Sequence, residues 1–250
     1  MSNSSTQPIL EFSDVSFSYL IPAAQVTSFK EAVHQIFKGK VFMKFKALEK
    51  ISFSVHKGER LAIIGRNGSG KTTLLRLICG IAEPEEGKAI IRGRIAPVLS
   101  LGAGLEPELT GLENVRLLGA FMDLTQVEEE TLLADVMSFS ELDLSTLKLQ
   151  VKRYSSGMMS RLSFAVAMAR KADILVVDEA LAVGDVAFQK KCHAVIEKFC
   201  VDGGTLIFVS HSLEEVRKLC RRVIVLNEGH LIFDGQTPDA LKIYENMLGM

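Results

Sequence analysis

The stretch Gly65-Arg66-Asn67-Gly68-Ser69-Gly70-Lys71-Thr72 decides the fold of this chain. An apolar run (61–64) precedes it and an amphipathic run (72–78) follows it, which predicts a strand, a glycine-rich turn and a helix. The spacing GxxxxGK followed by Ser or Thr is typical of a phosphate-binding loop. Its glycines let several backbone N–H groups face one anion at the positive end of a helix. Lys71 adds a full positive charge and Thr72 a hydroxyl for Mg²⁺, so we expect this loop to bind a nucleotide.

Composition and charge restrict the class of protein. The 250 residues suffice for one large domain, and 29 Lys and Arg against 30 Asp and Glu leave a net charge of −1. This balance gives no basic excess that would favour nucleic acid as a partner. The longest apolar runs are too short to cross a bilayer, so we expect any role at a membrane to come through a partner. Four cysteines without a CxxC pair indicate reduced thiols and no zinc site.

Strand-like and helical patterns alternate along the chain, which predicts a mostly parallel α/β fold. Strands are expected at 9–19, 51–55, 61–64, 88–99, 174–177 and 205–209, with a hairpin at 223–226 and 230–233. Helices are expected at 72–78, 112–121, 126–139, 155–171, 186–200 and 212–220, with a last helix that starts at Thr237.

The first two strands are separated by an insertion of about 27 residues, from Leu20 to Lys46. Its middle is apolar on one helical face and its end is basic: Phe29, Val33, Ile36 and Phe37, then Lys38, Lys40, Lys44, Lys46 and Lys50. One interpretation is a surface helix that covers the sheet, followed by a solvated loop. The other is an amphipathic helix that meets a membrane-embedded partner, with its lysines near anionic headgroups. The sequence leaves both open.

Two strand ends carry polar residues that suit phosphate chemistry. Asp178 ends the apolar strand at 174–177, which is the place of a carboxylate that holds Mg²⁺. Glu179 is adjacent and could accept a proton from an attacking water. His211 follows the strand at 205–209, where it could contact the outermost phosphate.

A third motif narrows the class of nucleotide-binding protein. Tyr154-Ser155-Ser156-Gly157-Met158 opens a helix 21 residues before Asp178, counted from Gly157. It resembles the signature motif of ABC-transporter ATPases, whose usual form is Leu-Ser-Gly-Gly-Gln. Lys71, this motif, Glu179 and His211 stand in the order and spacing of that family, and the resemblance covers essentially the whole chain.

The resemblance implies a fold of known type. It implies a P-loop NTPase (RecA-like) core of mostly parallel sheet, an antiparallel β subdomain and an inserted α-helical signature subdomain at about 110–171. We expect one ABC ATPase domain over residues 1–250, without a C-terminal carbohydrate-binding domain.

The resemblance also implies a head-to-tail homodimer with two molecules of ATP, each with Mg²⁺, at its interface. Each ATP is expected to contact the stretch from Gly65 to Thr73 of one protomer. The same ATP is expected to contact four residues of the other protomer: Ser155, Ser156, Gly157 and Asp185. Lys71, Glu179 and His211 are then the catalytic residues of an ATPase, and Thr72 and Asp178 the magnesium ligands. Tyr19 is the first candidate to stack on adenine, because it ends the first strand, and Phe45 is the second.

Departures from the usual motifs resemble one branch of the family. Ser156 replaces the first signature glycine, Met158 replaces the glutamine, and Ser100 or Leu101 occupies the place of the Q-loop glutamine. With the long insertion, these features look like the ATP-binding subunits of bacterial polysaccharide exporters for O-antigen, capsule or teichoic acid. That branch implies a separate integral-membrane permease and a location at the cytoplasmic face of the bacterial cytoplasmic membrane.

Other functions are less well supported by the sequence. An exporter of a lipid or drug would share the same motifs. A soluble ABC ATPase of DNA repair or translation would carry a second cassette or long coiled coils, and neither is present in these residues. A G protein would carry an Asn-Lys-x-Asp motif, which the sequence lacks.

Overall fold

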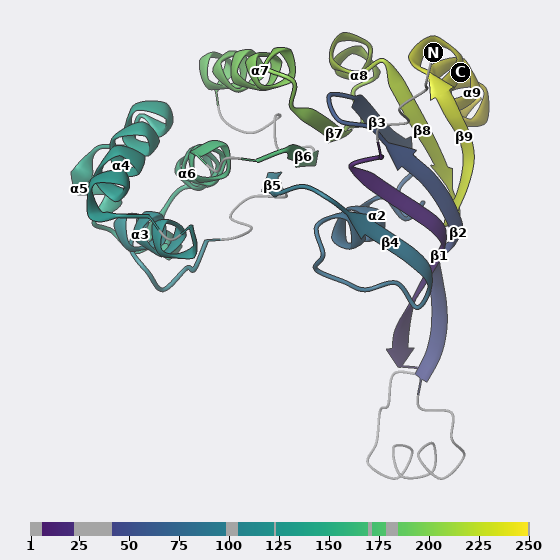
Figure 1. Cartoon of the computed structure of the whole chain (residues 1–250), viewed down its shortest axis with the longest axis horizontal. Helices are drawn as coiled ribbons and strands as arrows, with labels where there is room; N and C mark the ends of the chain where they lie inside the picture. The colour runs from purple at the N-terminus through teal and green to yellow at the C-terminus, as the bar shows by residue number, and fades with distance from the viewer. Residues whose placement is uncertain are drawn as a thin grey trace, which may run out of the picture.

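The computed structural model describes residues 7–22, 42–98, 105–122, 124–169, 172–178 and 185–249. A six-stranded sheet in the order β5-β6-β7-β3-β8-β9 forms its core (Figure 1). All neighbours in it pair in parallel except β9, which returns antiparallel to β8. The strands are β3 (Arg60–Gly65), β5 (Ile95–Val98), β6 (Ile174–Asp178), β7 (Thr205–Val209), β8 (Arg222–Asn227) and β9 (His230–Gln236). The mostly parallel α/β sheet predicted from the sequence is confirmed.

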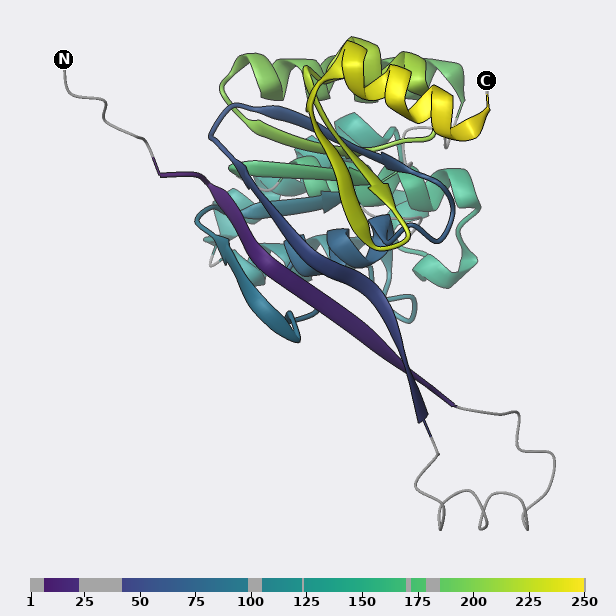
Figure 2. The same cartoon turned by 90° about the vertical axis from the view of Figure 1, so that its right-hand side faces the viewer.

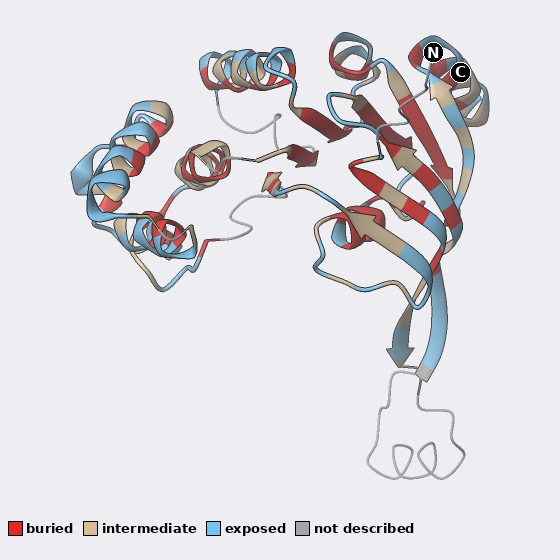
Figure 3. Ribbon diagram, viewed as in Figure 1, coloured by how far each residue is buried: buried red, intermediate tan, exposed pale blue. Residues whose placement is uncertain are grey.

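Both faces of the four inner strands of this sheet are buried, because these strands are nearly continuous apolar runs. In β3, Leu61 and Ile63 belong to one hydrophobic cluster and Ala62 and Ile64 to the other, and all four are at most 1% exposed. Figure 3 shows the same burial along the neighbouring strands. Residues of α7 (Val186–Val201), α8 (Leu213–Leu219) and α9 (Thr237–Leu248) pack on one face, and those of α2 (Lys71–Ile78) on the other.

A three-stranded antiparallel sheet lies against the same face as α2. Its order is β2-β1-β4, with β1 at Leu10–Pro22, β2 at Phe42–Val55 and β4 at Glu86–Ile91. Leu10, Phe12 and Phe53 join Leu74 of α2 in one cluster, and the rings of Phe12 and Phe53 stack with centroids 5.1 Å apart. This packing holds the start of α2 in a fixed place beside β3.

The predicted boundaries of the insertion are wrong. β1 continues to Pro22 and β2 begins at Phe42, so residues 20–22 and 42–46 form a two-stranded arm that projects from the body (Figure 2). The alternation of apolar and polar residues could not predict this arm, because its apolar side chains are not buried: Leu20 and Met43 are 65% and 61% exposed. The two strands are held together by backbone hydrogen bonds.

Two lysines of the expected basic segment are strand residues that meet carboxylates. Lys44 pairs with Glu85, and the Lys46 Nζ lies 2.7 Å from the Glu49 Oε1. These two charges are therefore partly balanced within the protein. The helix expected around residues 29–37 lies outside the described residues.

A group of helices forms one end of the molecule, beside the edge of the main sheet that ends in β5 (Figure 1). It contains α3 (Gly111–Phe121), α4 (Gln126–Ser140), α5 (Leu144–Leu147), the short η1 (Val151–Arg153) and α6 (Ser156–Ala169). Thr110 and Thr125 begin α3 and α4 with capping boxes, in which a glutamate three residues later binds back to the cap. The predicted helices at 112–121, 126–139 and 155–171 are confirmed within two residues at each end.

The cysteines are sequestered, as the sequence predicts. Cys192, Cys200 and Cys220 are buried, Cys79 is half-buried, and none of the four forms a disulfide. Burial raises the pKa of Cys79 to about 12, so this thiol at the C-terminal end of α2 stays protonated at neutral pH. Among the described residues, no helix is both long and apolar enough to cross a membrane.

Candidate nucleotide-binding site

The predicted phosphate loop joins the buried strand β3 to helix α2, and its glycines are required by close backbone contacts. A Cβ at Gly65 would lie 2.4 Å from the carbonyl oxygen of Leu226 and 2.5 Å from Ser69 Oγ. Gly70 has a φ of 103°, and a Cβ there would lie 2.7 Å from the carbonyl oxygen of Ala47. These positions accept only glycine without strain. The loop is therefore pressed closely between β8 and β2.

A turn from a distant part of the chain supports this loop. The backbone N–H of Gly229, in the β8–β9 turn, donates to the carbonyl oxygen of Ser69 at 3.1 Å. The same Gly229 accepts from the N–H of Glu49 in β2 at 2.8 Å. The sequence predicts a turn at 227–229, but it does not predict that this turn contacts the phosphate loop, which lies some 160 residues earlier in the chain.

Lys71 lies inside the loop rather than in solvent. Its side chain is 7% exposed, and its Nζ donates to the carbonyl oxygens of Gly65 at 2.7 Å and Arg66 at 3.1 Å. Gly70, the N-cap of α2, has no side chain to cap the helix, and the first turn of α2 contains no acidic residue. The first N–H groups of α2 thus face an anion-binding position beside a buried ammonium group.

A cavity of about 460 Å³ opens above the loop. It brings together most of the residues that the sequence singles out, from five separate segments. Its walls are Tyr19, Phe45, Ala47, Asn67, Gly68, Gly70, Lys71, Thr72, Thr73, Asp178 and His211. Its volume falls in the range of small-molecule sites. Ala47 and the β8–β9 turn are the parts that sequence reasoning missed.

Asp178 and His211 meet there because their strands are neighbours. β6 and β7 pair in parallel with Asp178 opposite Val209, so the residues after both strands gather at one edge of the sheet. Thr72 and Asp178 bring a hydroxyl and a carboxylate into the same cavity, and oxygen donors of this kind suit Mg²⁺. Within the described residues, no cluster of three His, Cys, Asp or Glu could hold a metal by itself.

The two aromatic candidates are direct neighbours. Tyr19 and Phe45 face each other across the β1–β2 pair, so both side chains lie on one face of the arm. The hydroxyl of Tyr19 lies 3.2 Å from Thr73 Oγ1, and Arg76 Nη1 donates to it at 3.2 Å. These two contacts fix the Tyr19 ring against α2, whereas Phe45 is 53% exposed.

The signature segment lies outside this cavity. Ser155 and Ser156 are exposed at the start of α6, where Ser155 Oγ accepts from the N–H of Met158 at 3.2 Å. A Cβ at Gly157 would meet nothing closer than 4.0 Å, so this surface is open. None of the three residues lines the nucleotide cavity of its own chain.

Asp185, also expected at the nucleotide, is engaged in local contacts. Its side chain caps α7 by accepting from the N–H of Phe188 at 2.9 Å, and it pairs with Arg161 Nη2 at 2.5 Å. These contacts, the Phe188 N–H first, lower the pKa of Asp185 below its usual value. Glu179 and the expected Q-loop positions Ser100 and Leu101 lie outside the described residues.

Comparisons with known proteins agree with this geometry. The family model described as "ABC transporter" matches residues 48–182. The chain is 37% identical to the O-antigen export system ATP-binding protein RfbB of Klebsiella pneumoniae, over 97% of this chain and 99% of that protein. It is 38% identical to the ABC transporter protein AbcA of Aeromonas salmonicida, over 98% of this chain and 78% of that protein. The teichoic acids export ATP-binding protein TagH of Listeria innocua is 36% identical, and the chain spans 62% of its length.

Solved structures support the fold. The dimeric post-hydrolysis structure of the ATP-binding cassette MJ0796 bound to ADP and Pi matches with a TM-score of 0.73. That match covers 91% of this chain and 98% of the cassette at 22% sequence identity. With a phosphate loop, a carboxylate and a histidine at one sheet edge, and relatives above 30% identity over almost its full length, this chain belongs to the ABC transporter family.

Proposed function

We propose that this chain is the ATP-hydrolysing subunit of an exporter that moves a lipid-linked, O-antigen-like polysaccharide across the cytoplasmic membrane. The observation that carries the proposal is its end-to-end similarity to two O-antigen export ATP-binding proteins. They are 37% and 38% identical, over 97% and 96% of this chain and 99% of each relative. The matches to the TagH proteins of Listeria innocua and Bacillus anthracis cover 62% and 36% of the length of those proteins.

In this proposal, residues 65–73 bind the phosphates of ATP and the cavity above them holds the rest of the nucleotide. Two features support the fit. The first turn of α2 is uncapped, and the buried hydroxyl of Ser69 has no hydrogen-bond partner among the described residues. Thr72 and Asp178 would hold Mg²⁺ together with phosphate oxygens and water, and the ion would offset negative charge on the phosphates.

Three side chains divide the work of hydrolysis. Glu179 follows the end of β6 directly and would take a proton from the water that attacks the γ-phosphate. His211, on the cavity wall, would orient the γ-phosphate. Lys71 would stabilise the negative charge on the transferred group, in place of the loop carbonyls that it now contacts.

The second half of each site would come from another copy of the chain. Ser155 and Ser156 are exposed and Gly157 is half-buried at the positive end of α6, which suits an anion supplied from outside the chain. Asp185 would lie close to the same interface, where its ion pair with Arg161 would help to position the segment after Glu179. The functional unit is then a head-to-tail homodimer with two ATP molecules.

Export also requires a membrane partner. We propose that the ATPase dimer binds a separate permease at the cytoplasmic face of the membrane, because its RfbB relatives are the ATP-binding proteins of an export system. The two-stranded arm and the helices α3 to α5 are the surfaces of the described chain that project farthest from the sheet (Figures 1 and 2).

Deletion of the gene in its own host tests this function. We expect the surface polysaccharide to disappear from intact cells and to accumulate inside them, which immunoblots of surface and lysate fractions would measure. A plasmid that carries the wild-type chain should restore the surface polymer, and one that carries Lys71→Ala should not. A normal surface polymer after deletion would contradict the proposed substrate, while leaving the ATPase assignment intact.

The aromatic wall gives a separate prediction about adenine. Tyr19→Ala should weaken ATP binding by about tenfold, because stacking on a base contributes about 1–3 kcal/mol. Tyr19→Phe keeps the ring and loses only the contacts to Thr73 and Arg76, so it should bind nearly as well as wild type. Met43→Ala, on the same face but outside the cavity, is the control. Calorimetry would measure the ATP affinity of these three variants and of Phe45→Ala. A tenfold loss of affinity in Phe45→Ala but not in Tyr19→Ala would show that adenine stacks on Phe45 instead.

A further inference from the structure

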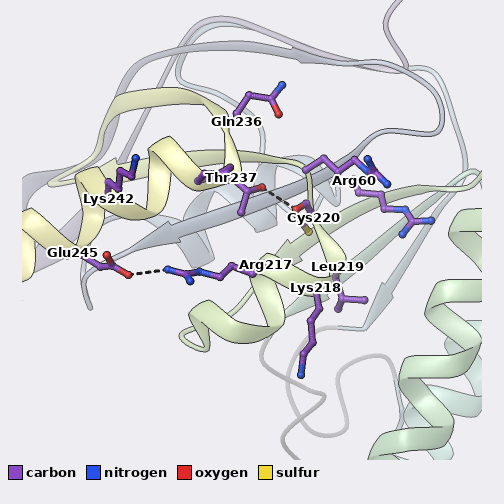
Figure 4. Close-up of a pocket in the computed structure, with 11 residues that line it drawn as sticks. Arg60, Arg217, Lys218, Leu219, Cys220, Gln236, Thr237, Lys242 and Glu245 are labelled. Atoms are coloured by element: carbon purple, nitrogen blue, oxygen red, sulfur yellow. Dashed lines mark hydrogen bonds and ion pairs between the residues drawn. The ribbon is translucent and has the colours of Figure 1, made fainter.

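A second cavity lies at the opposite edge of the main sheet. Its volume is about 670 Å³, and it is bounded by the start of β3, the end of α8 and the first turns of α9 (Figure 4). It shares no residue with the nucleotide cavity. Arg60 begins β3 and Gly65 ends it, so roughly 16 Å of strand separate the two sites.

The lining of this cavity is strongly cationic. Of its eleven residues, five are Arg or Lys and one is acidic: Arg60, Arg217, Lys218, Arg221 and Lys242 against Glu245. The whole chain has a net charge of −1, so this concentration of positive charge is local. Positive side chains in a concave site raise the local concentration of anions.

Internal contacts account for only part of these charges. Arg217 Nη2 lies 3.2 Å from Glu245 Oε1, and Lys218 Nζ lies 2.6 Å from Glu214 Oε1. Both cations also suit the negative end of α8. In the described part of the chain, no ion pair forms to Arg60, Arg221 or Lys242. These three are left to bind an external anion.

The floor of the cavity is made of buried residues, whose low dielectric strengthens the field of the cations above it. Leu219, Cys220 and Thr237 are at most 5% exposed. The hydroxyl of Thr237 donates to the carbonyl oxygen of Cys220 at 2.8 Å, and its N–H donates to the carbonyl oxygen of Arg221 at 3.1 Å. Figure 4 shows Arg60 at one end of the cavity and Lys242 at the other, on either side of Thr237. The charges are thus spaced around a preformed hollow.

We infer that this cavity is a second anion site, which binds a small ligand with two or more linked phosphate groups. Its volume fits a small molecule, whereas a membrane surface is flat and would meet only the rim. The fork of an arginine matches the oxygens of a phosphate group in two directions, and two arginines without internal partners are present. Several cations around one hollow favour several negative groups on one ligand.

Titration calorimetry with inorganic pyrophosphate tests the inference. The full-length protein is first saturated with ADP, so that the phosphate loop is occupied, and the buffer has low ionic strength. The double variant Arg221→Ala/Lys242→Ala removes two cations whose side chains are exposed and make no internal ion pair. The control Lys148→Ala/Lys190→Ala removes two exposed lysines that do not line either cavity.

We expect pyrophosphate to bind the wild type and the control alike, and to bind the cavity variant about tenfold more weakly or not at all. Binding should weaken as salt is added, since the charges are partly exposed. Equal binding in all three proteins, or no binding to the wild type, would overturn the inference. Tighter binding of hexaglutamate than of pyrophosphate would also overturn it, because the occupant would then be an acidic polypeptide.

Discussion

Replacement of Lys71 with alanine is expected to reduce ATP hydrolysis by about a hundredfold or more. Lys71 is 7% exposed, and the rest of the loop faces the cavity with neutral groups only, since Arg66 is not among the residues that line it. The other cations near the nucleotide cavity are not part of its wall, since Lys71 is the single Lys or Arg among the residues that line it. No other Lys or Arg of the described cavity wall can therefore replace its charge as negative charge moves on the phosphates.

The same change has a smaller effect on the fold. Lys71 Nζ donates hydrogen bonds to the carbonyl oxygens of Gly65 and Arg66. Alanine removes both bonds, so water must hydrogen-bond to these two oxygens instead. Losing such bonds costs about 1–3 kcal/mol, which lowers the thermal midpoint by several degrees but leaves the domain folded. The loss of hydrolysis should then far exceed the loss of folded protein.

Phosphate release and thermal unfolding, measured on the same preparations, separate the two effects. Lys71→Arg is the informative companion, because it keeps the charge but places a planar fork where the loop admits a point charge. We expect it to be nearly as inactive as alanine. Lys148→Ala, on the surface of the helical region, should behave as wild type. A Lys71→Ala protein with half of the wild-type rate would remove Lys71 from catalysis.

The sequence predicted the main sheet because its strands are dictated locally. A run of four apolar residues, as at 174–177 and 206–209, is typical of a strand buried on both faces. The phosphate loop was predictable because its residue spacing is a known local motif, although the contacts that require glycine at 65 and 70 come largely from Leu226 and Ala47, which are distant in sequence. Asp178 and His211 followed because parallel strands end at one edge.

Other features depend on contacts between distant residues and have no local signature. The arm at 20–22 and 42–46 is paired by its backbone, so the exposed side chains of Leu20 and Met43 gave no alternating pattern. The contact of Gly229 with Ser69 joins two turns that are far apart in sequence. The neighbouring positions of Tyr19 and Phe45 required the strand register, which the sequence left open.

Replacement of Glu179 with glutamine should slow hydrolysis by about a hundredfold or more, yet leave ATP binding unchanged. Glutamine has nearly the same size as glutamate but cannot take the proton from the attacking water. The residues of the phosphate loop and the cavity wall are untouched. ATP that is bound but not hydrolysed should therefore accumulate on the protein, and with it the ATP-bound form, called the closed form below.

If the closed form is a head-to-tail dimer, Glu179→Gln should elute as a monomer without nucleotide and as a dimer with ATP. Light scattering during gel filtration would measure both masses. Hydrolysis by Glu179→Gln at the wild-type rate would show that another group activates the water. A protein that binds ATP but stays monomeric at micromolar concentration would contradict the proposed shared site.

A second change in the same background tests which surface completes the site. Gly157→Glu should abolish the ATP-dependent dimer, because a carboxylate at the start of α6 would face the γ-phosphate bound to the partner. The fold should tolerate it: a Cβ at Gly157 meets nothing closer than 4.0 Å, and an acidic side chain suits the positive end of a helix. Gly157→Gln, which has nearly the same size without the charge, is the matched control and should weaken the dimer less.

Since Gly157 does not line the cavity of its own chain, ATP binding to the monomer should be equal in all three proteins. Loss of the dimer with ATP binding intact would assign Gly157 to the partner's nucleotide, and an unchanged dimer would remove the signature segment from the interface.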